Sequence, residues 1–170
     1  MPAAFIRRGS DMLEAAVDIF GRLAAYVSVA LVLVVAGNVF ARYFFRTGTI
    51  WLQELEWHLI SPIALLGMSY TLLKGEQVRV DFLFDQMPPA LRHVIEIATG
   101  ILTIVFAVLV AKLSLPFVEQ AWRIGEGSPN PGGMPYRFAL KALIPIGFAL
   151  LAVQGLAHTL RHGLAVLRRS

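Results

Sequence analysis

Four long apolar stretches constrain this chain more than any other feature of its sequence. They lie at about 23–45, 51–73, 95–117 and 138–160, and each is as long as the roughly 20 residues with which a helix crosses a bilayer. The composition agrees, because 57% of the residues are hydrophobic and 15% are charged, whereas about a quarter are charged in a soluble domain. The sequence therefore predicts an all-α integral membrane protein in which residues 1–170 form a single domain with four transmembrane helices.

The segments between these stretches predict how the chain lies in the bilayer. Acidic residues at the N-terminus argue against a cleavable signal peptide, and residues 11–24 instead predict an amphipathic helix at the membrane interface. A second interfacial helix is expected in the middle loop, which Pro88 and Pro89 close before the third span begins. Four spans place both termini on one side. Nine of the 15 Lys and Arg residues fall on that side and six on the other, which favours cytoplasmic termini.

Several functional classes are excluded or disfavoured by the residue types present. The chain has no cysteine, which excludes thiolate metal sites, iron–sulfur clusters and disulfides. Its net charge of +4 is spread over loops and ends, as expected of a protein that faces anionic lipid rather than nucleic acid. The loop 126–135 is rich in turn residues but lacks the strand and the Gly-Lys-Ser/Thr of a phosphate-binding loop. We expect a protein that is not an enzyme and binds no cofactor or metal.

The second stretch carries the most informative polar residues. Glu54 and Glu56 lie near its start between Trp51 and Trp57, and tryptophan beside charge is typical of the headgroup level. The two acids project from opposite faces of the helix, so they cannot serve one partner. Intramembrane carboxylates are candidates for an ion site, but an interfacial position favours pairing. The acids are therefore candidates for contacts between helices or subunits, and the face that carries Gly67 is expected to approach another helix closely.

Other polar and small residues predict further packing contacts. Gly147 and Gln154 share one face of the fourth span, which suits close packing against another helix. Arg42 and Arg46 lie at the far end of the first span and are possible partners of the two acids. Glu96, near the start of the third span, is expected to extend its carboxylate to the interface.

The histidines leave one alternative function open. His93 and His158 lie on the same predicted side and could approach each other, as axial ligands do in a four-helix membrane anchor of a haem-containing oxidoreductase. His58 lies at the opposite end and cannot join them. Histidines at such positions are more commonly solvated or hydrogen-bonded than bound to haem. A small drug exporter is disfavoured, because the first span offers only Asn38 in place of a buried acid.

Four motifs in the right order resemble the small membrane subunit, DctQ-like, of the tripartite ATP-independent periplasmic (TRAP) transporters. The resemblance covers about residues 20–160, and its C-terminal part is similar to the branch often labelled mannitol/chloroaromatic compound transport. Gln77 stands where many members have histidine, so a protonation role there does not carry over. The motifs are Asn38–Tyr43, Trp51–Trp57, Val78–Asp81 and Trp122–Gly155.

The resemblance implies a subunit of the bacterial inner membrane that scaffolds a large multi-helix permease. The permease would carry out sodium-driven uptake of small organic acids delivered by a periplasmic binding protein. Outer-face contacts to the binding protein would come from Arg42, Arg46, Ser128 and Asn130. Contacts to the large subunit would come from Glu54, Glu56, Gly67, Asp81, Gly147 and Gln154.

Overall fold

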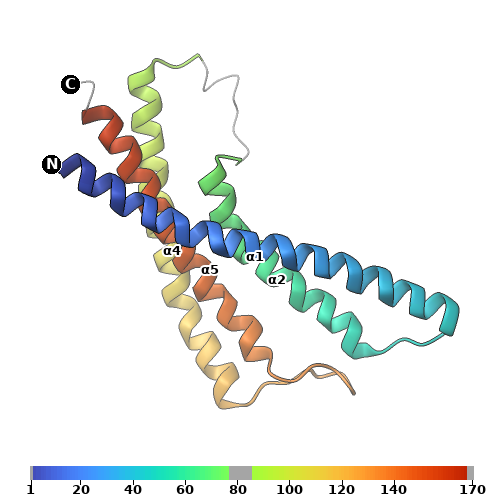
Figure 1. Cartoon of the computed structure of the whole chain (residues 1–170). Helices are drawn as coiled ribbons and strands as arrows, with labels where there is room; N and C mark the ends of the chain where they lie inside the picture. Colours follow the sequence, from blue (N-terminus) through green and yellow to red (C-terminus); the bar gives the residue numbers. More distant parts are fainter. Residues whose placement is uncertain (1, 77–85, 168–170) are drawn as a thin grey trace.

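The computed structural model describes residues 2–76 and 86–167, and these residues form helices without a strand (Figure 1). The helices are α1 (Pro2–Phe45), α2 (Ile50–Lys74), α4 (Pro89–Arg123) and α5 (Arg137–Leu167). The predicted interfacial helix of the middle loop lies outside the described residues, as do Gln77 and Asp81. The all-helical architecture predicted from the sequence is confirmed for the described chain.

The helix boundaries follow from local chemistry. α2 ends at Gly75, whose φ of 72° is left-handed and whose N–H bonds to the carbonyl of Leu72, a conformation that glycine adopts without a steric penalty. α4 begins at Pro89, as predicted, because proline fits the first helical position, where its missing N–H costs nothing. α1 runs from Pro2 to Phe45 without a break, so the predicted interfacial segment and the first span form one continuous helix.

The helices form two antiparallel hairpins that cross each other. α1 packs on α2, α4 packs on α5, and α5 also contacts both α1 and α2. Figure 1 shows the two hairpins diverging from the crossing, with the start of α1 and the end of α5 near each other. The α1–α2 turn and the 124–136 loop lie at the ends of the hairpins away from the termini (Figure 1). The predicted placement of the termini on one side is consistent with this arrangement, and their cytoplasmic location stays a prediction.

Ion pairs join the helices at the end near the termini. The ammonium of Lys74, the last residue of α2, lies 3.1 Å from the Asp18 carboxylate of α1. This carboxylate raises the pKa of Lys74, because it accepts a hydrogen bond from the charged form. Arg161 of α5 pairs with Glu14 of α1. α1 is therefore tied to both α2 and α5.

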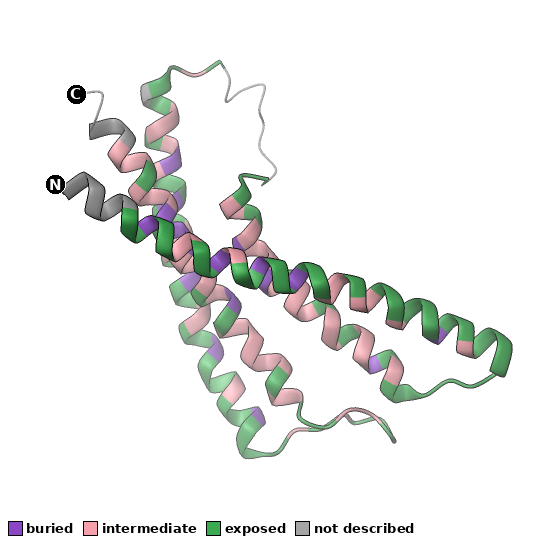
Figure 2. Cartoon of the chain, in the orientation of Figure 1, coloured by how far each residue is buried: buried purple, intermediate pink, exposed green. Residues whose placement is uncertain are grey.

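Three of the helices contain segments long and apolar enough to cross a membrane, namely Arg8–Phe45, Leu91–Arg123 and Arg137–Leu164. α2 is not among them, and its apolar run is interrupted by His58, Ser61 and Pro62. The fourth span therefore stays a prediction. Figure 2 shows buried residues where the helices cross and mostly exposed residues along the free length of α1. Such exposed apolar faces require lipid or a partner protein.

Candidate functional site

Glu54 of α2 is held by the loop that connects α4 to α5. The residue is only 4% exposed. Asn130 donates its side-chain N–H to Oε1 over 2.9 Å, and the backbone N–H of Met134 donates to Oε2 over 2.7 Å. The hydroxyl of Ser128 also donates to Oε1. One carboxylate from the first hairpin therefore fastens the loop of the second hairpin.

The loop is shaped to receive this carboxylate. Gly132 has a φ of 76°, which favours glycine. A Cβ at the next residue, Gly133, would lie 2.5 Å from Cβ of Ser128 and 2.7 Å from Oε2 of Glu54, so a larger residue there would displace these side chains. The Glu126 carboxylate pairs with Lys141 of α5, and the carbonyl of Glu126 accepts the N–H of Arg137 over 2.9 Å. The 126–135 loop is thus an ordered part of the helix packing.

Glu56 is bound on the opposite face of α2, as the helical geometry predicted. The amide N–H of Asn38 on α1 donates to its carboxylate over 2.7 Å. Asn38 is 5% exposed, and the bond is partly buried between the helices of the first hairpin. The sequence suggested Arg42 or Arg46 as partners of the two acids, whereas the bonds described here come from neutral donors. The separation of the two acids onto different partners is nevertheless observed.

We expect Asn38→Leu to weaken the α1–α2 hairpin. The leucine cannot donate, and a carboxylate that loses its partner between helices costs about 1–3 kcal/mol. Thermal unfolding in detergent should show a lower melting temperature than in the wild type. Glu56→Gln retains an acceptor oxygen for Asn38 and should cost less. A melting temperature unchanged by Asn38→Leu would contradict a stabilising role for this bond.

Two further residues that were predicted to contact the large subunit, Gly147 and Gln154, pack against other parts of this chain. A Cβ at Gly147 of α5 would lie 2.7 Å from the carbonyl oxygen of Leu65 on α2, so the two backbones touch there. Gln154 is 2% exposed, and its Oε1 has no hydrogen-bond partner among the described residues. Gly67 of α2 differs, because a Cβ there would meet nothing within 4 Å. The predicted contacts of these residues with a large subunit stay predictions.

The four residues that are predicted to contact the binding protein at the outer face differ in where their side chains point. Arg42 and Arg46 lie at the α1–α2 turn, where the side chain of Arg42 lies beside Gly48. Arg46 has a φ of 52°, which an arginine rarely adopts, and it marks the sharp end of α1. Ser128 and Asn130, by contrast, direct polar atoms inward to Glu54. The two arginines are therefore the better placed for a contact with another protein.

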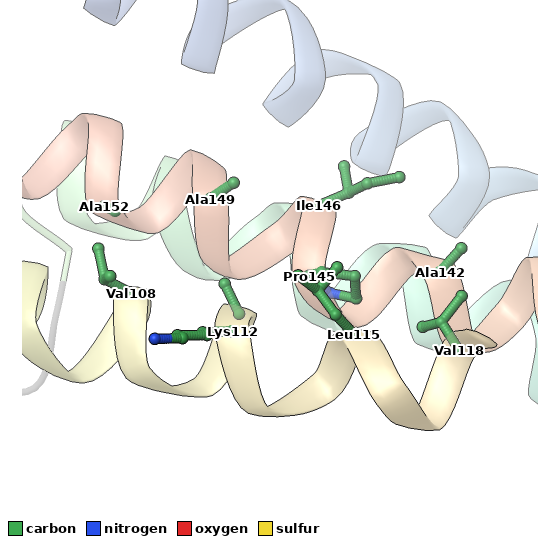
Figure 3. Close-up of a pocket in the computed structure, with 10 residues that line it drawn as sticks. Val108, Lys112, Leu115, Val118, Ala142, Pro145, Ile146, Ala149 and Ala152 are labelled. Atoms are coloured by element: carbon green, nitrogen blue, oxygen red, sulfur yellow. The ribbon is translucent and has the colours of Figure 1, made fainter. Parts of the chain in front are cut away.

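An apolar groove runs between α4 and α5 of the second hairpin (Figure 3). Val108 and Leu115 of α4 face Pro145 and Ala149 of α5 across it, and Lys112 is the charged residue in its lining. The groove is open along its length and faces the surroundings of the protein. It is a surface that lipid tails or an apolar partner helix would cover.

A cluster of histidines and one carboxylate joins α4 to α5 near the termini. His158 Nε2 lies 2.8 Å from Glu96 Oε2, and Glu96 is 6% exposed. His93 and His162 approach with their Nδ1 atoms 3.5 Å apart. The sequence suggested that His93 could approach His158, whereas the structure places His93 beside His162 and pairs His158 with Glu96. The expectation that Glu96 extends to the interface is wrong, because its carboxylate is buried against His158. The spacings His-x-x-Glu and His-x-x-x-His could have revealed the cluster, since each places two donors on one helix face.

The fold and these sites define a multi-pass helical membrane protein whose polar side chains join its own helices to one another. Residues 31–163 match the family model for the DctQ component of the tripartite ATP-independent periplasmic transporters. The chain belongs to this family of small TRAP permease subunits of the bacterial inner membrane, as the sequence motifs indicated.

A named relative is similar over a large part of the chain. It is the C4-dicarboxylate TRAP transporter small permease protein DctQ of Vibrio cholerae serotype O1, which is 26% identical over 149 residues. The aligned region covers 76% of this chain and 64% of the relative. The chain therefore spans a little under two thirds of the length of the relative that it matches.

Proposed function

We propose that the chain scaffolds the large permease of a sodium-driven, binding-protein-dependent transporter of small organic acids. The proposal rests on the hydrogen bonds that Glu54 accepts from the 126–135 loop. This interfacial acid fastens a loop to α2 instead of facing an open cavity. A carboxylate that joins a loop to a helix in this way stabilises the packing of the helices. The family match supports the transport system, and the relative's name supports an organic acid as substrate.

The large permease is proposed to contact α2 beside Gly67, on the side of the helix whose Glu56 and Tyr70 pack on α1 at either end. The space beside Gly67 is open in this chain, whereas Gly147 already contacts Leu65. Small residues let two helix backbones approach closely in a membrane. Glu54 and Glu56 contribute indirectly, because they hold α2 between α1 and the 126–135 loop. The groove beside Lys112 is a second apolar surface, which a helix of the permease or lipid would cover.

We expect Gly67→Leu to lower copurification of the large permease several-fold, because the leucine fills the space that the partner helix needs. The measurement is the ratio of the two subunits after affinity purification of a tagged small subunit from cells that express both. Gly163→Leu is a matched control, since a Cβ at Gly163 also meets nothing within 4 Å. Equal recovery of the permease with Gly67→Leu and with the wild type would exclude this face as the interface.

The binding protein is proposed to approach the α1–α2 turn. Arg42 and Arg46 are both exposed there, and surface charges of this kind act mainly on the rate of association. The double variant Arg42→Glu and Arg46→Glu should lower binding-protein-dependent uptake several-fold and leave copurification of the permease intact. Arg8→Glu, an exposed position near the other end of α1, is the control. Unchanged uptake by the double variant would place the docking surface elsewhere.

A further inference from the structure

We propose that the histidine cluster between α4 and α5 is a binding site for a divalent transition metal, with Zn²⁺ as the preferred ion. His93 and Glu96 are three residues apart on α4, and His158 and His162 are four apart on α5. Both spacings place the two side chains on one face of a helix. Imidazole and carboxylate are ordinary ligands of Zn²⁺, and paired sites of this kind are built from facing helices in bundles.

The ligand atoms of three of these side chains lie close to the spacing that one ion requires. One ligand atom each from Glu96, His158 and His162 lie within 4.8 Å of one another. Zn²⁺ holds nitrogen and oxygen ligands at about 2.0–2.2 Å, so two ligands of one ion lie at most about 4 Å apart. Convergence by about 1 Å is needed, which rotation of the side chains supplies. His93, with Nδ1 3.5 Å from that of His162, is a fourth donor within reach.

The backbone around the cluster is held rigidly, one turn away. A Cβ at Gly100 of α4 would lie 3.3 Å from the carbonyl of Gly155 on α5, and a Cβ at Gly155 would lie 3.3 Å from the carbonyl of Gly100. The two helices therefore touch through their backbones next to Glu96 and His158. A metal site gains affinity when its ligands are positioned by rigid elements, because less ordering is required on binding.

The ligand atoms are shielded from water, and two cationic residues, Arg92 of α4 and Arg161 of α5, lie near them in the sequence. Glu96 and His158 have side chains only 8% and 11% exposed, so water competes weakly for the ligand atoms. The neighbouring cationic residue of α5, Arg161, is turned to α1, where it pairs with Glu14 and lies 3.2 Å from Asp11. Glu96 contacts His158 and His162 contacts His93, so the four side chains already lie in two contacting pairs. A bound Zn²⁺ would engage all of them.

Zinc binding by the purified full chain tests the proposal. The protein is prepared with a removable tag that contains no histidine, and Zn²⁺ is titrated by calorimetry in detergent. We expect one Zn²⁺ per chain, and at least a tenfold loss of affinity in Glu96→Gln and in His162→Ala, since each removes one ligand. His58→Ala is the control, because His58 Nδ1 lies 2.7 Å from the Glu54 carbonyl at the other end of the hairpins.

A second measurement keeps the test independent of folding defects. Zn²⁺ should raise the melting temperature of the wild type and of His58→Ala, because an ion that binds only the folded state stabilises it. The same ion should leave the melting temperature of His162→Ala unchanged. Zn²⁺ binding that is absent in the wild type, or equally tight in the Glu96 and His162 variants, would overturn the proposal. The cluster would then be a hydrogen-bonded contact between the two helices.

Discussion

Replacing Gly147 by leucine is expected to force α5 away from α2 and to lower the melting temperature by roughly 5–10 °C. A Cβ at this position would lie 2.7 Å from the carbonyl oxygen and 3.0 Å from the carbonyl carbon of Leu65. Backbone atoms cannot rotate away as a side chain does, so the helices must separate. Thermal unfolding in detergent, followed by circular dichroism, measures the effect.

Gly67→Leu is the matched control for this experiment. It places the same side chain in α2, two residues beyond Leu65, but its Cβ meets nothing within 4 Å inside the chain. The melting temperature of the isolated Gly67→Leu protein should therefore stay close to that of the wild type. If both leucine variants melt alike, α2 and α5 do not pack as closely as the structure shows.

Glu54→Ala is expected to release the 126–135 loop and to raise its cleavage by proteinase K roughly tenfold, because cleavage follows the population of the open loop. The alanine removes the acceptor of three hydrogen bonds, from Ser128, Asn130 and the backbone of Met134. Limited proteolysis with identification of the fragments gives the rate at the loop.

Two further variants test whether Glu54 protects the loop through its hydrogen bonds. Glu54→Gln keeps one acceptor oxygen but presents an amide N–H₂ to the donors of the loop, so its cleavage rate should fall between those of Glu54→Ala and the wild type. Glu119→Ala is the control, since Glu119 forms an exposed pair with Arg123 within α4. Wild-type protection of the loop in Glu54→Ala would show that other contacts hold it.

Features of single helices were predictable from the sequence. Apolar length indicated the helices, and Pro89 marked the start of α4, because such signals depend only on neighbouring residues. The opposite directions of Glu54 and Glu56 followed from the geometry of one helix. The sequence also favoured pairing over an ion site for these acids, because tryptophans beside them are typical of the interface.

The partners of the polar residues could not be predicted, because they come from distant parts of the chain. Glu54 binds Asn130, 76 residues further on, and Glu96 binds His158, 62 residues further on. An acid near the end of a span can extend to the interface or bond across helices, and only the packing decides between them. The crossing of the two hairpins brings these side chains together.

Uptake by reconstituted vesicles tests whether this chain scaffolds a transporter whose transport pathway lies in the large permease. Vesicles that contain the chain alone, the large permease alone, or both are given the binding protein, a labelled small organic acid that this binding protein binds, and an inward sodium gradient. We expect sodium-dependent uptake only where both subunits are present. Sodium-driven uptake by vesicles that contain this chain alone would contradict the scaffold account.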